Sequence, residues 1–249
     1  MTIFEKAYIY DEQAGQILLA SRWNGLWEYH LQTGILQRTT FVKNNWIAAL
    51  FVDSSGCIWL SPYGKGLVGY GPDKKQICHL KAPEKLSNGI ILDIKERDGK
   101  LWLATDGGGI NVYDRTSGSV TVINYVPGKQ SSLPTGSFWC LYNDPDNNIW
   151  AGSIRGGLIG LKEIFIQTYQ DVRLNSSYGL SDKTVADMYE DKDGFIWLGT
   201  DGGGMNRLEP QTGQFRHYPS TYQSKIVSVI SYGKTKLLYS CFGEGLFLF

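Results

Sequence analysis

The sequence predicts an all-β fold, a β-propeller with six recognisable four-stranded blade repeats, of which the last is incomplete. Three observations predict it: a tryptophan motif recurs every 41 to 48 residues, a glycine follows each copy at a fixed distance, and the composition favours strands and turns, with 30 Gly, 8 Trp and 15 Tyr among 249 residues. Four strands per repeat at this period are typical of propellers. We expect one propeller domain or propeller segment over 1–249, with blades at about 3–40, 41–82, 83–126, 127–170, 171–219 and 220–249.

The first marker is a short strand that reads Ile-Trp-Leu in its clearest copies. A tryptophan offers a large flat apolar body, which can fill the wedge between two neighbouring sheets. We therefore expect the tryptophans of this strand to be buried between blades. The residues at this central position, in chain order, are Leu18, Trp59, Trp102, Trp150, Trp197 and Leu238.

The second marker is a glycine seven residues after each central position, followed by Leu, Ile or Met. Glycine lets a turn adopt backbone angles that other residues avoid. All six copies match at one offset, so two independent features indicate the same repeat register. The six glycines are Gly25, Gly66, Gly109, Gly157, Gly204 and Gly245.

Each repeat is expected to form four strands, a to d. Strand a is short and apolar, as in 47–52, and a tight acidic turn such as 53–56 leads to strand b with the tryptophan. A glycine-rich turn leads to strand c, as in 110–113, and a second turn leads to strand d, as in 214–218. In a propeller the b–c and d–a loops share one face, around the mouth of the central channel.

The segment 196–213, Ile-Trp-Leu-Gly-Thr-Asp-Gly-Gly-Gly-Met-Asn-Arg-Leu-Glu-Pro-Gln-Thr-Gly, resembles the two-component regulator propeller repeat. The segment 101–118 is similar, and so is the lead-in 179–185, Gly-Leu-Ser-Asp-Lys-Thr-Val. The resemblance covers essentially the whole chain and is most specific in the third and fifth repeats. It implies the periplasmic sensor region of a hybrid two-component histidine kinase of the Bacteroidetes type. In such proteins a ligand, often a glycan, binds outside the membrane and drives a kinase inside.

The chain departs from the family's layout in two respects. It has six repeats where the family commonly closes with seven, and it stops at Phe249, in strand c of the last repeat. We therefore expect a segment of a longer protein, part of a seven-bladed or double propeller, in which later residues supply strand d. A self-contained ring in which 2–5 pairs with the last repeat is the alternative. The sequence contains no kinase ATP site, no phospho-acceptor domain and no run of 18 apolar residues.

Composition limits the classes of partner. The 24 basic and 24 acidic residues give a net charge of zero, which argues against a nucleic-acid binder. The N-terminal residues 1–11 lack the features of a signal peptide, so either the protein is cytosolic or a signal segment is absent from this sequence. We expect no cofactor and no metal. The expected partners are a small-molecule ligand such as an oligosaccharide and further domains of the parent chain, with a homodimer left open. Four cysteines in no CxxC pair are expected to be free and mostly buried: Cys57, Cys78, Cys140 and Cys241.

The motifs that carry catalytic chemistry are missing, so we expect no enzyme activity of this chain. The three histidines fall in strands c or d of separate repeats and are expected to be ordinary strand residues: His30, His79 and His217. The Gly-Lys-Thr at 233–235 lacks the first glycine of a P-loop, because Ser228 stands there. The segment 144–148 resembles a calcium loop, but Ile149 stands where the turn glycine should be. Both segments are predicted to be hairpin turns.

Candidate binding residues come from the loops, where the repeats differ from one another. Aromatic faces beside Arg, Asn and Asp groups suit a sugar, whose CH faces stack on rings while its hydroxyls form hydrogen bonds. The alternative is that these are ordinary exposed turns. The expected rim residues are Arg22, Trp23, Trp46, Tyr63, Lys65, Asp106, Arg155 and Asp201, with Asn44, Asn45, Ser181 and Asp182 in the d–a loops. Asp93 and Asp187, at matching positions of strand a, are expected to face the channel and to bind a cation, a ligand or water.

The sequence thus leads to a non-catalytic, extracytoplasmic ligand-sensing propeller that responds to a carbohydrate. Two rivals stay open. Lyases and hydrolases also occur on propellers, because a fold does not determine a function, and a histidine or paired acid in the rim would favour an enzyme. A flat, aromatic-rich face that binds a peptide would favour a protein-interaction scaffold.

Overall fold

The computed structural model describes the chain over residues 4–11, 15–21, 23–43, 46–125, 133–161, 166–169, 179–218, 221, 225–233 and 236–249. Over these ranges the regular structure is antiparallel β-strand, with no α-helix and therefore no helix that could cross a membrane. The strands form five four-stranded sheets and one three-stranded sheet, which confirms the β-propeller prediction and the six repeats. The three strands of the last sheet match the predicted strands a, b and c.

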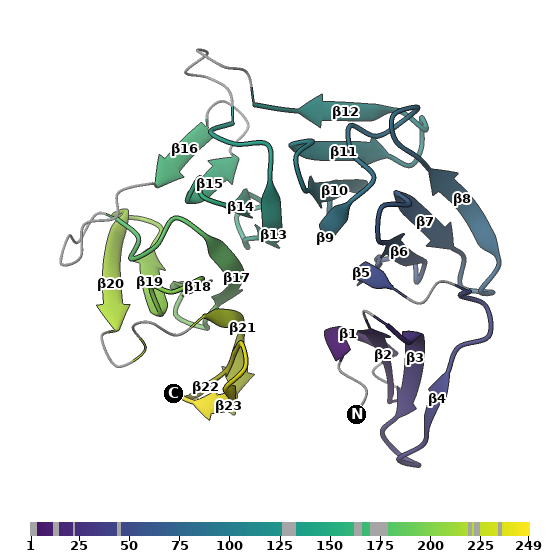
Figure 1. Ribbon diagram of the computed structural model, residues 1–249, viewed down its shortest axis with the longest axis horizontal. Coiled ribbons are helices and arrows are strands. Elements are labelled where there is room, and N and C mark those ends of the chain that lie inside the picture. The colour runs from purple at the N-terminus through teal and green to yellow at the C-terminus, as the bar shows by residue number, and fades with distance from the viewer. Residues whose placement is uncertain are drawn as a thin grey trace. The chain divides into compact units, whose positions relative to one another are not determined.

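The chain divides into two compact units, an N-terminal unit over Met1–Ile123 and a C-terminal unit over Asn124–Phe249. In each unit three sheets follow one another along the chain, and the first strand of each sheet packs against the first strand of the next (Figure 1). Within every four-stranded sheet the strands pair in chain order, so each sheet is an up-and-down meander.

The N-terminal unit contains sheets 1 to 3. Sheet 1 comprises β1 (Phe4–Asp11), β2 (Gln16–Ser21), β3 (Gly25–His30) and β4 (Leu36–Arg38). Sheet 2 comprises β5 (Ile47–Val52), β6 (Ile58–Pro62), β7 (Leu67–Tyr70) and β8 (Gln76–Leu80). Sheet 3 comprises β9 (Ile91–Arg97), β10 (Lys100–Thr105), β11 (Ile110–Asp114) and β12 (Val120–Ile123). Phe4 and Glu5 belong to β1, in which Phe4 pairs with Ser21 of β2.

The C-terminal unit contains sheets 4 to 6. Sheet 4 comprises β13 (Phe138–Asn143), β14 (Ile149–Ser153), β15 (Leu158–Leu161) and β16 (Ile166–Tyr169). Sheet 5 comprises β17 (Val185–Glu190), β18 (Ile196–Thr200), β19 (Met205–Glu209) and β20 (Gln214–Tyr218). Sheet 6 comprises β21 (Ile226–Tyr232), β22 (Lys236–Cys241) and β23 (Gly245–Leu248).

The predicted tryptophans form the contacts between sheets. Trp59, Trp150 and Trp197 are buried, as expected. Each indole N–H donates a hydrogen bond of 2.7–2.8 Å to the aspartate of the acidic turn before its own strand. The acidic turn therefore has a second role beyond reversing the chain, because it supplies the acceptor that a buried indole needs.

Trp102 is the exception among the four, since it is only half-buried. Its hairpin is shortened to the two residues Asp98 and Gly99, both with positive φ, as a tight type I′ turn requires. This turn therefore lacks the aspartate that accepts the indole N–H in sheets 2, 4 and 5. The guanidinium of Arg97 instead lies 5.5 Å from the Trp102 ring centroid. The expectation that the tryptophans are buried between sheets is confirmed for the other three, whereas Trp102 is only half-buried.

Charged groups tie sheet 2 to sheet 3. Arg115 forms ion pairs with the fully buried carboxylate of Asp53 and with Glu96. Glu96 also accepts the Ser54 amide at 2.7 Å. In the C-terminal unit the hydroxyl of Tyr142 in sheet 4 donates to Glu190 in sheet 5. Burial and this hydrogen bond raise the pKa of Tyr142.

Strand a of every sheet contains a β-bulge near its first residue, and β1 has a second one near its end. A bulge inserts one unpaired residue and re-aims its side chain, and such bulges are common beside binding sites. In sheets 2 to 6 the bulged residue is more exposed than the residue before it, which is fully buried. The bulged residues of these sheets are Ala48, Leu92, Trp139, Ala186 and Val227.

Candidate functional site

One backbone hydrogen bond recurs where each strand a begins. In sheets 2 to 6 the amide of the first residue after strand b donates to the carbonyl of the residue just before strand a of the same sheet, at 2.9–3.1 Å. We call these two residues a bridge pair. The pairs are Tyr63 with Trp46, Asp106 with Ile90, Ile154 with Ser137, Asp201 with Thr184 and Phe242 with Lys225. Within each unit the b–c and d–a loops therefore meet at one end of the sheets, as predicted.

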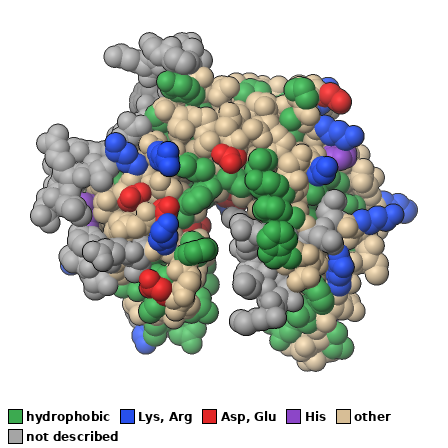
Figure 2. All heavy atoms as spheres, in the orientation of Figure 1, with side chains coloured by type: hydrophobic (Ala, Val, Ile, Leu, Met, Phe, Trp, Pro, Cys, Tyr) green, Lys and Arg blue, Asp and Glu red, His purple; other side chains and the backbone are tan. Residues whose placement is uncertain are grey.

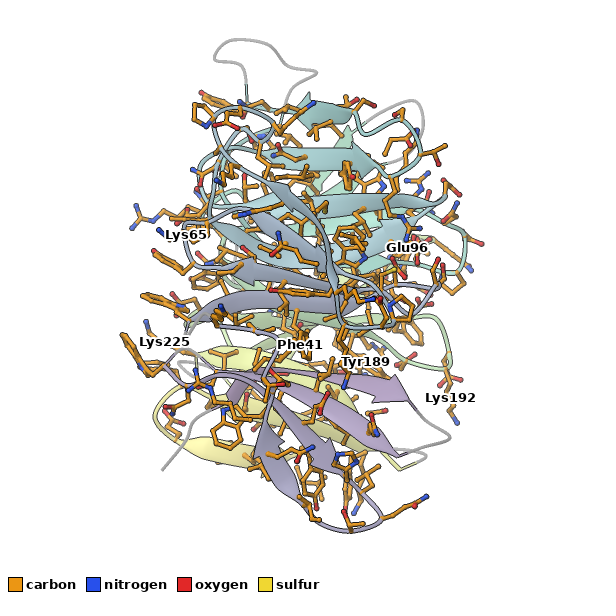
Figure 3. All side chains as sticks on the ribbon, turned by 90° about the vertical axis from the view of Figure 1, so that its right-hand side faces the viewer. Phe41, Lys65, Glu96, Tyr189, Lys192 and Lys225 are labelled. Atoms are coloured by element: carbon orange, nitrogen blue, oxygen red, sulfur yellow. The ribbon has the colours of Figure 1, made fainter. Side chains whose placement is uncertain are left out.

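This end is separate from the end that carries the acidic turns. In the N-terminal unit Lys65 of a b–c loop and Glu96 beside an a–b turn lie at opposite ends of the sheets (Figure 3). Lys225 and Lys192 do so in the C-terminal unit. The backbone hydrogen bond of the bridge pairs is the same in each of these sheets, whereas the side chains of the pairs differ. The repeat therefore holds different side chains in the same position of each sheet.

The b–c loop of sheet 2 differs from those of sheets 3, 4 and 5. Those three sheets have a glycine just before the marker glycine, where a Cβ would meet a serine Oγ at 2.4–2.7 Å. Sheet 2 has Lys65 at that position. Gly89 of the following d–a loop packs closely against this loop, since a Cβ there would lie 3.0 Å from the Gly64 carbonyl oxygen.

Three aromatic side chains form a platform in the N-terminal unit. The rings of Trp46 and Tyr63, one bridge pair, stack with centroids 3.9 Å apart and planes 12° apart. Trp23, from the b–c loop of sheet 1, lies 5.3 Å from Trp46 at 45°. Trp23 is 67% exposed and Tyr63 is 41% exposed, so the rings meet solvent. Hydrophobic side chains gather on the face in view over β5 (Figure 2). We name these three residues the aromatic platform.

Polar side chains stand in b–c loops at the same end of the sheets as the platform. The exposed Lys65 follows Tyr63 by two residues, and its carbonyl accepts a hydrogen bond of 2.8 Å from Nε2 of His79. Asp106 occupies the loop position of the neighbouring sheet, and its carbonyl accepts the Asn88 amide at 2.7 Å. An apolar surface with a lysine and a carboxylate at nearby loop positions fits a ligand with one apolar face and several hydroxyls.

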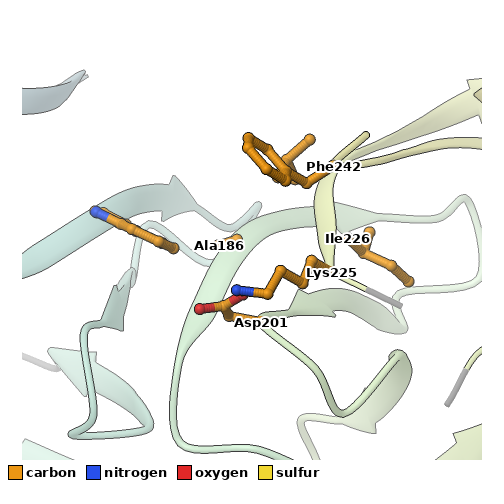
Figure 4. Close-up of a pocket in the computed structure, with 7 residues that line it drawn as sticks. Ala186, Asp201, Lys225, Ile226 and Phe242 are labelled. Atoms are coloured by element: carbon orange, nitrogen blue, oxygen red, sulfur yellow. The ribbon is translucent and has the colours of Figure 1, made fainter. Parts of the chain in front are cut away.

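The C-terminal unit contains a pocket of about 180 Å³ at the same end of its sheets. It is lined by Trp139, Ala186, Asp201, Lys225, Ile226, Val227 and Phe242. The bulged residues of sheets 4, 5 and 6 are all among them, so the bulges build its walls. The Lys225 ammonium lies beside the Asp201 carboxylate, and the Phe242 ring stands across the pocket from them (Figure 4).

The charged groups of this pocket are held in place. Lys225 Nζ lies 3.0 Å from an Asp201 carboxylate oxygen, and the two residues also form a backbone bridge. Asp182, in the adjoining loop, is half-buried. Burial raises the pKa of Asp182, and the negative charge of Asp201 adds to the rise, while the Thr184 amide and Lys225 oppose it.

The structure places the remaining predicted residues as follows. Arg22, Asn44 and Asn45 lie outside the described residues. The amide of Arg155, in the b–c loop of sheet 4, donates to Thr184 Oγ1 at 3.4 Å, so Arg155 and Asp201 both contact Thr184. The rim as a set stays a prediction, since its members belong to two units.

The two strand-a aspartates are engaged in the sheets. Asp93 is buried, and its carboxylate accepts the amide of Ile94 at 2.9 Å. Asp187 is half-buried and accepts the amide of Val229 in the next sheet at 2.8 Å. Their role in a channel stays a prediction. Over the described residues no cluster of three His, Cys, Asp or Glu side chains is arranged to hold a metal ion.

The histidines and cysteines occupy structural positions. His79 and His217 lie in d strands and each donates from Nε2 to a backbone carbonyl, of Lys65 and Gly179 respectively. Cys140 is buried, and its thiol contacts the Val185 carbonyl at 3.8 Å. Cys57 and Cys78 are half-buried free thiols whose pKa is raised by burial.

Sequence reasoning missed Trp139 and Lys225, and it placed Phe242 only as part of a b–c loop of the rim. The repeat alignment contained a signal for Trp139. Trp139 stands where the other sheets have Ala48, Leu92, Ala186 and Val227, so it is the one ring at the bulge. Lys225 and Phe242 form the last bridge pair, which only the backbone hydrogen bond identifies.

The family model described as "two component regulator propeller" matches residues 132–155 and 179–202. The first segment covers β13 and β14 of sheet 4, and the second covers β17 and β18 of sheet 5. No curated protein matches the sequence.

Solved structures share the fold at low sequence identity. A catalytically inactive virginiamycin B lyase from Staphylococcus aureus, crystallised with quinupristin, is 14% identical, with a TM-score of 0.73, over 96% of this chain and 77% of that chain. PorZ, a surface component of the type-IX secretion system of Porphyromonas gingivalis, is 16% identical, with a TM-score of 0.71, over 99% of this chain and 40% of that chain. A computationally designed protein, Ika8, is 13% identical, with a TM-score of 0.65, over 100% of this chain and 71% of that chain.

Proposed function

We propose, from the match of residues 132–155 and 179–202 to the family model of two component regulator propellers, that this chain is an extracytoplasmic ligand-sensing domain that binds a carbohydrate on the aromatic platform. The family description supports a regulatory role. The stacked pair of the half-buried Trp46 and the exposed Tyr63 is the observation that carries the choice of ligand.

The platform supports a sugar for three physical reasons. Exposed aromatic clusters of this kind mark binding surfaces, because leaving them in water is unfavourable. The apolar CH face of a pyranose covers a ring, while its hydroxyls reach polar groups such as Lys65. Backbone hydrogen bonds hold the bridge pair, so little order is lost on binding, and preorganisation of this kind raises affinity.

The signal would pass through a change in domain packing. In this proposal the chain is the periplasmic part of a hybrid histidine kinase, and ligand binding shifts the population between two arrangements of the sensor. The ligand can shift that equilibrium only by its difference in affinity for the two arrangements. The platform lies on loops rather than in the core, which places the ligand where neighbouring domains could read it.

The test is a glycan array probed with the whole chain and with the Trp46→Ala variant. We expect the wild type to bind a defined set of oligosaccharides and the variant to lose them, because the loss of one ring breaks the stack. Trp102→Ala serves as the matched control, since Trp102 is a half-buried structural tryptophan away from the loops, and it should retain binding. Failure of the wild type to bind any glycan, or full binding by Trp46→Ala, would refute the proposal.

A second candidate is an enzyme of the lyase or hydrolase type. Asp182 and Asp201 supply the paired acids that would favour it, and a lyase shares the fold. Incubation of the chain with the glycans it binds, followed by mass spectrometry, separates the two functions. A sensor returns every glycan intact, whereas an enzyme yields products whose formation is lost in Asp182→Asn.

A further inference from the structure

We propose that the pocket of the C-terminal unit is a second binding site, specific for a small zwitterion with an apolar side chain, such as an apolar α-amino acid. The walls, the charges and the size of the pocket each point to this class. The site is distinct from the aromatic platform, because all of its lining residues belong to the C-terminal unit.

The lining of the pocket favours an apolar ligand group. Five of the seven lining side chains are apolar, namely Trp139, Ala186, Ile226, Val227 and Phe242. Phe242 is 73% exposed and Val227 is 46% exposed, so a ligand would cover apolar surface that now meets water. Burial of such surface stabilises a complex.

The charged residues of the pocket favour a ligand that carries both a positive and a negative charge. Asp201 and Lys225 are the only charged residues of the lining, and they form one ion pair at its edge. A ligand ammonium would bind Asp201 while a ligand carboxylate binds Lys225, so that both charges keep a partner when the pair opens. A ligand with one charge would pair with only one of the two residues, whereas a zwitterion pairs with both.

The small number of polar groups argues against a sugar. A sugar has several hydroxyls that each need a donor or an acceptor, and the lining supplies only two polar side chains, Asp201 and Lys225. The pocket, at about 180 Å³, is also smaller than the roughly 300–1,000 Å³ of sites for drug-sized ligands. A single amino acid therefore suits it better than an oligosaccharide.

The repeat scaffold makes the site rigid. The Phe242 amide donates to the Lys225 carbonyl at 2.9 Å, and the Asp201 amide donates to the Thr184 carbonyl at 3.1 Å. The same backbone geometry that presents the aromatic platform in the N-terminal unit thus presents a charged pair and a ring here.

The test is calorimetric titration of the whole chain with L-phenylalanine, up to about 10 mM because weak binding is expected. Phenethylamine lacks the carboxylate and 3-phenylpropionate lacks the ammonium, so both should bind at least tenfold more weakly. Asp201→Asn, Lys225→Met and Phe242→Ala should each weaken binding at least tenfold. Asp106→Asn is the matched control, since it occupies the same repeat position in the other unit, and it should bind as the wild type does.

Four results would overturn the proposal: no saturable binding of L-phenylalanine, equal binding of the two one-charge analogues, an equal loss in Asp106→Asn, or displacement of L-phenylalanine by an oligosaccharide. If Asp201→Asn fails to fold by circular dichroism, Phe242→Ala decides, because its ring is exposed. Trp46→Ala should leave this titration unchanged, which separates the outcome from that of the carbohydrate proposal.

Discussion

The contact of Trp59 with Gly69 gives the sharpest test of how the sheets pack. The two residues pair across β6 and β7, and a Cβ on Gly69 would lie 2.6 Å from Cζ3 of the indole. Gly69 does not have a positive φ, so an alanine there is strained only by the ring. Trp59→Ala should destabilise the protein by about 3–5 kcal/mol. Gly69→Ala should destabilise it by about 1–3 kcal/mol through overpacking.

The double variant separates this account from simple additivity. Once the ring is removed, Gly69→Ala has free space and should become neutral or stabilising by about 0.5–1 kcal/mol, as alanine is in a strand. The coupling energy should therefore reach at least about 1.5 kcal/mol, which urea denaturation followed by circular dichroism resolves. Additive effects of the two substitutions would refute the packing of the indole over Gly69.

Three further predictions follow from the fold. Trp102→Ala should destabilise the protein less than Trp59→Ala, because Trp102 is only half-buried; equal denaturation midpoints would contradict this. Gly204→Ala should be more destabilising than Gly202→Ala, although both glycines have positive φ, because a Cβ on Gly204 would lie 2.3 Å from a backbone carbonyl oxygen while Gly202 has open space. The raised pKa of Asp182 contributes stability that is present below the unfolded pKa and is lost as the pH rises through the folded pKa. Asp182→Asn should therefore gain stability relative to the wild type between pH 3 and pH 7, and a constant difference in melting temperature would contradict this.

Much of the fold could be predicted because packing repeats. A buried tryptophan and a glycine with positive φ each tolerate few substitutes, so they recur in the sequence at one spacing, and six sheets follow from them. The shortened hairpin at Asp98 and Gly99 is visible in the sequence as one missing residue. Its consequence for Trp102 became clear only from the structure, in which the turn aspartates of other sheets accept hydrogen bonds from the indoles.

The candidate sites were predictable only in part. Trp23, Trp46 and Tyr63 were recognisable as aromatics in loops, but their mutual stacking depends on the bridge hydrogen bond, which leaves no mark in the sequence. The pocket depends on bulges, and a bulge changes which side chain meets solvent without changing the strand pattern. Trp139 was therefore overlooked.

The most direct test of the account is to observe the indole N–H signals in an NMR spectrum while the oligosaccharide selected by the glycan array is added. The chain has eight tryptophans, and single substitutions assign their signals. We predict that the signals of Trp23 and Trp46 shift progressively, while those of the buried Trp59 and Trp150 stay in place. Binding that leaves the signals of Trp23 and Trp46 unchanged would contradict the aromatic platform as the sensing site.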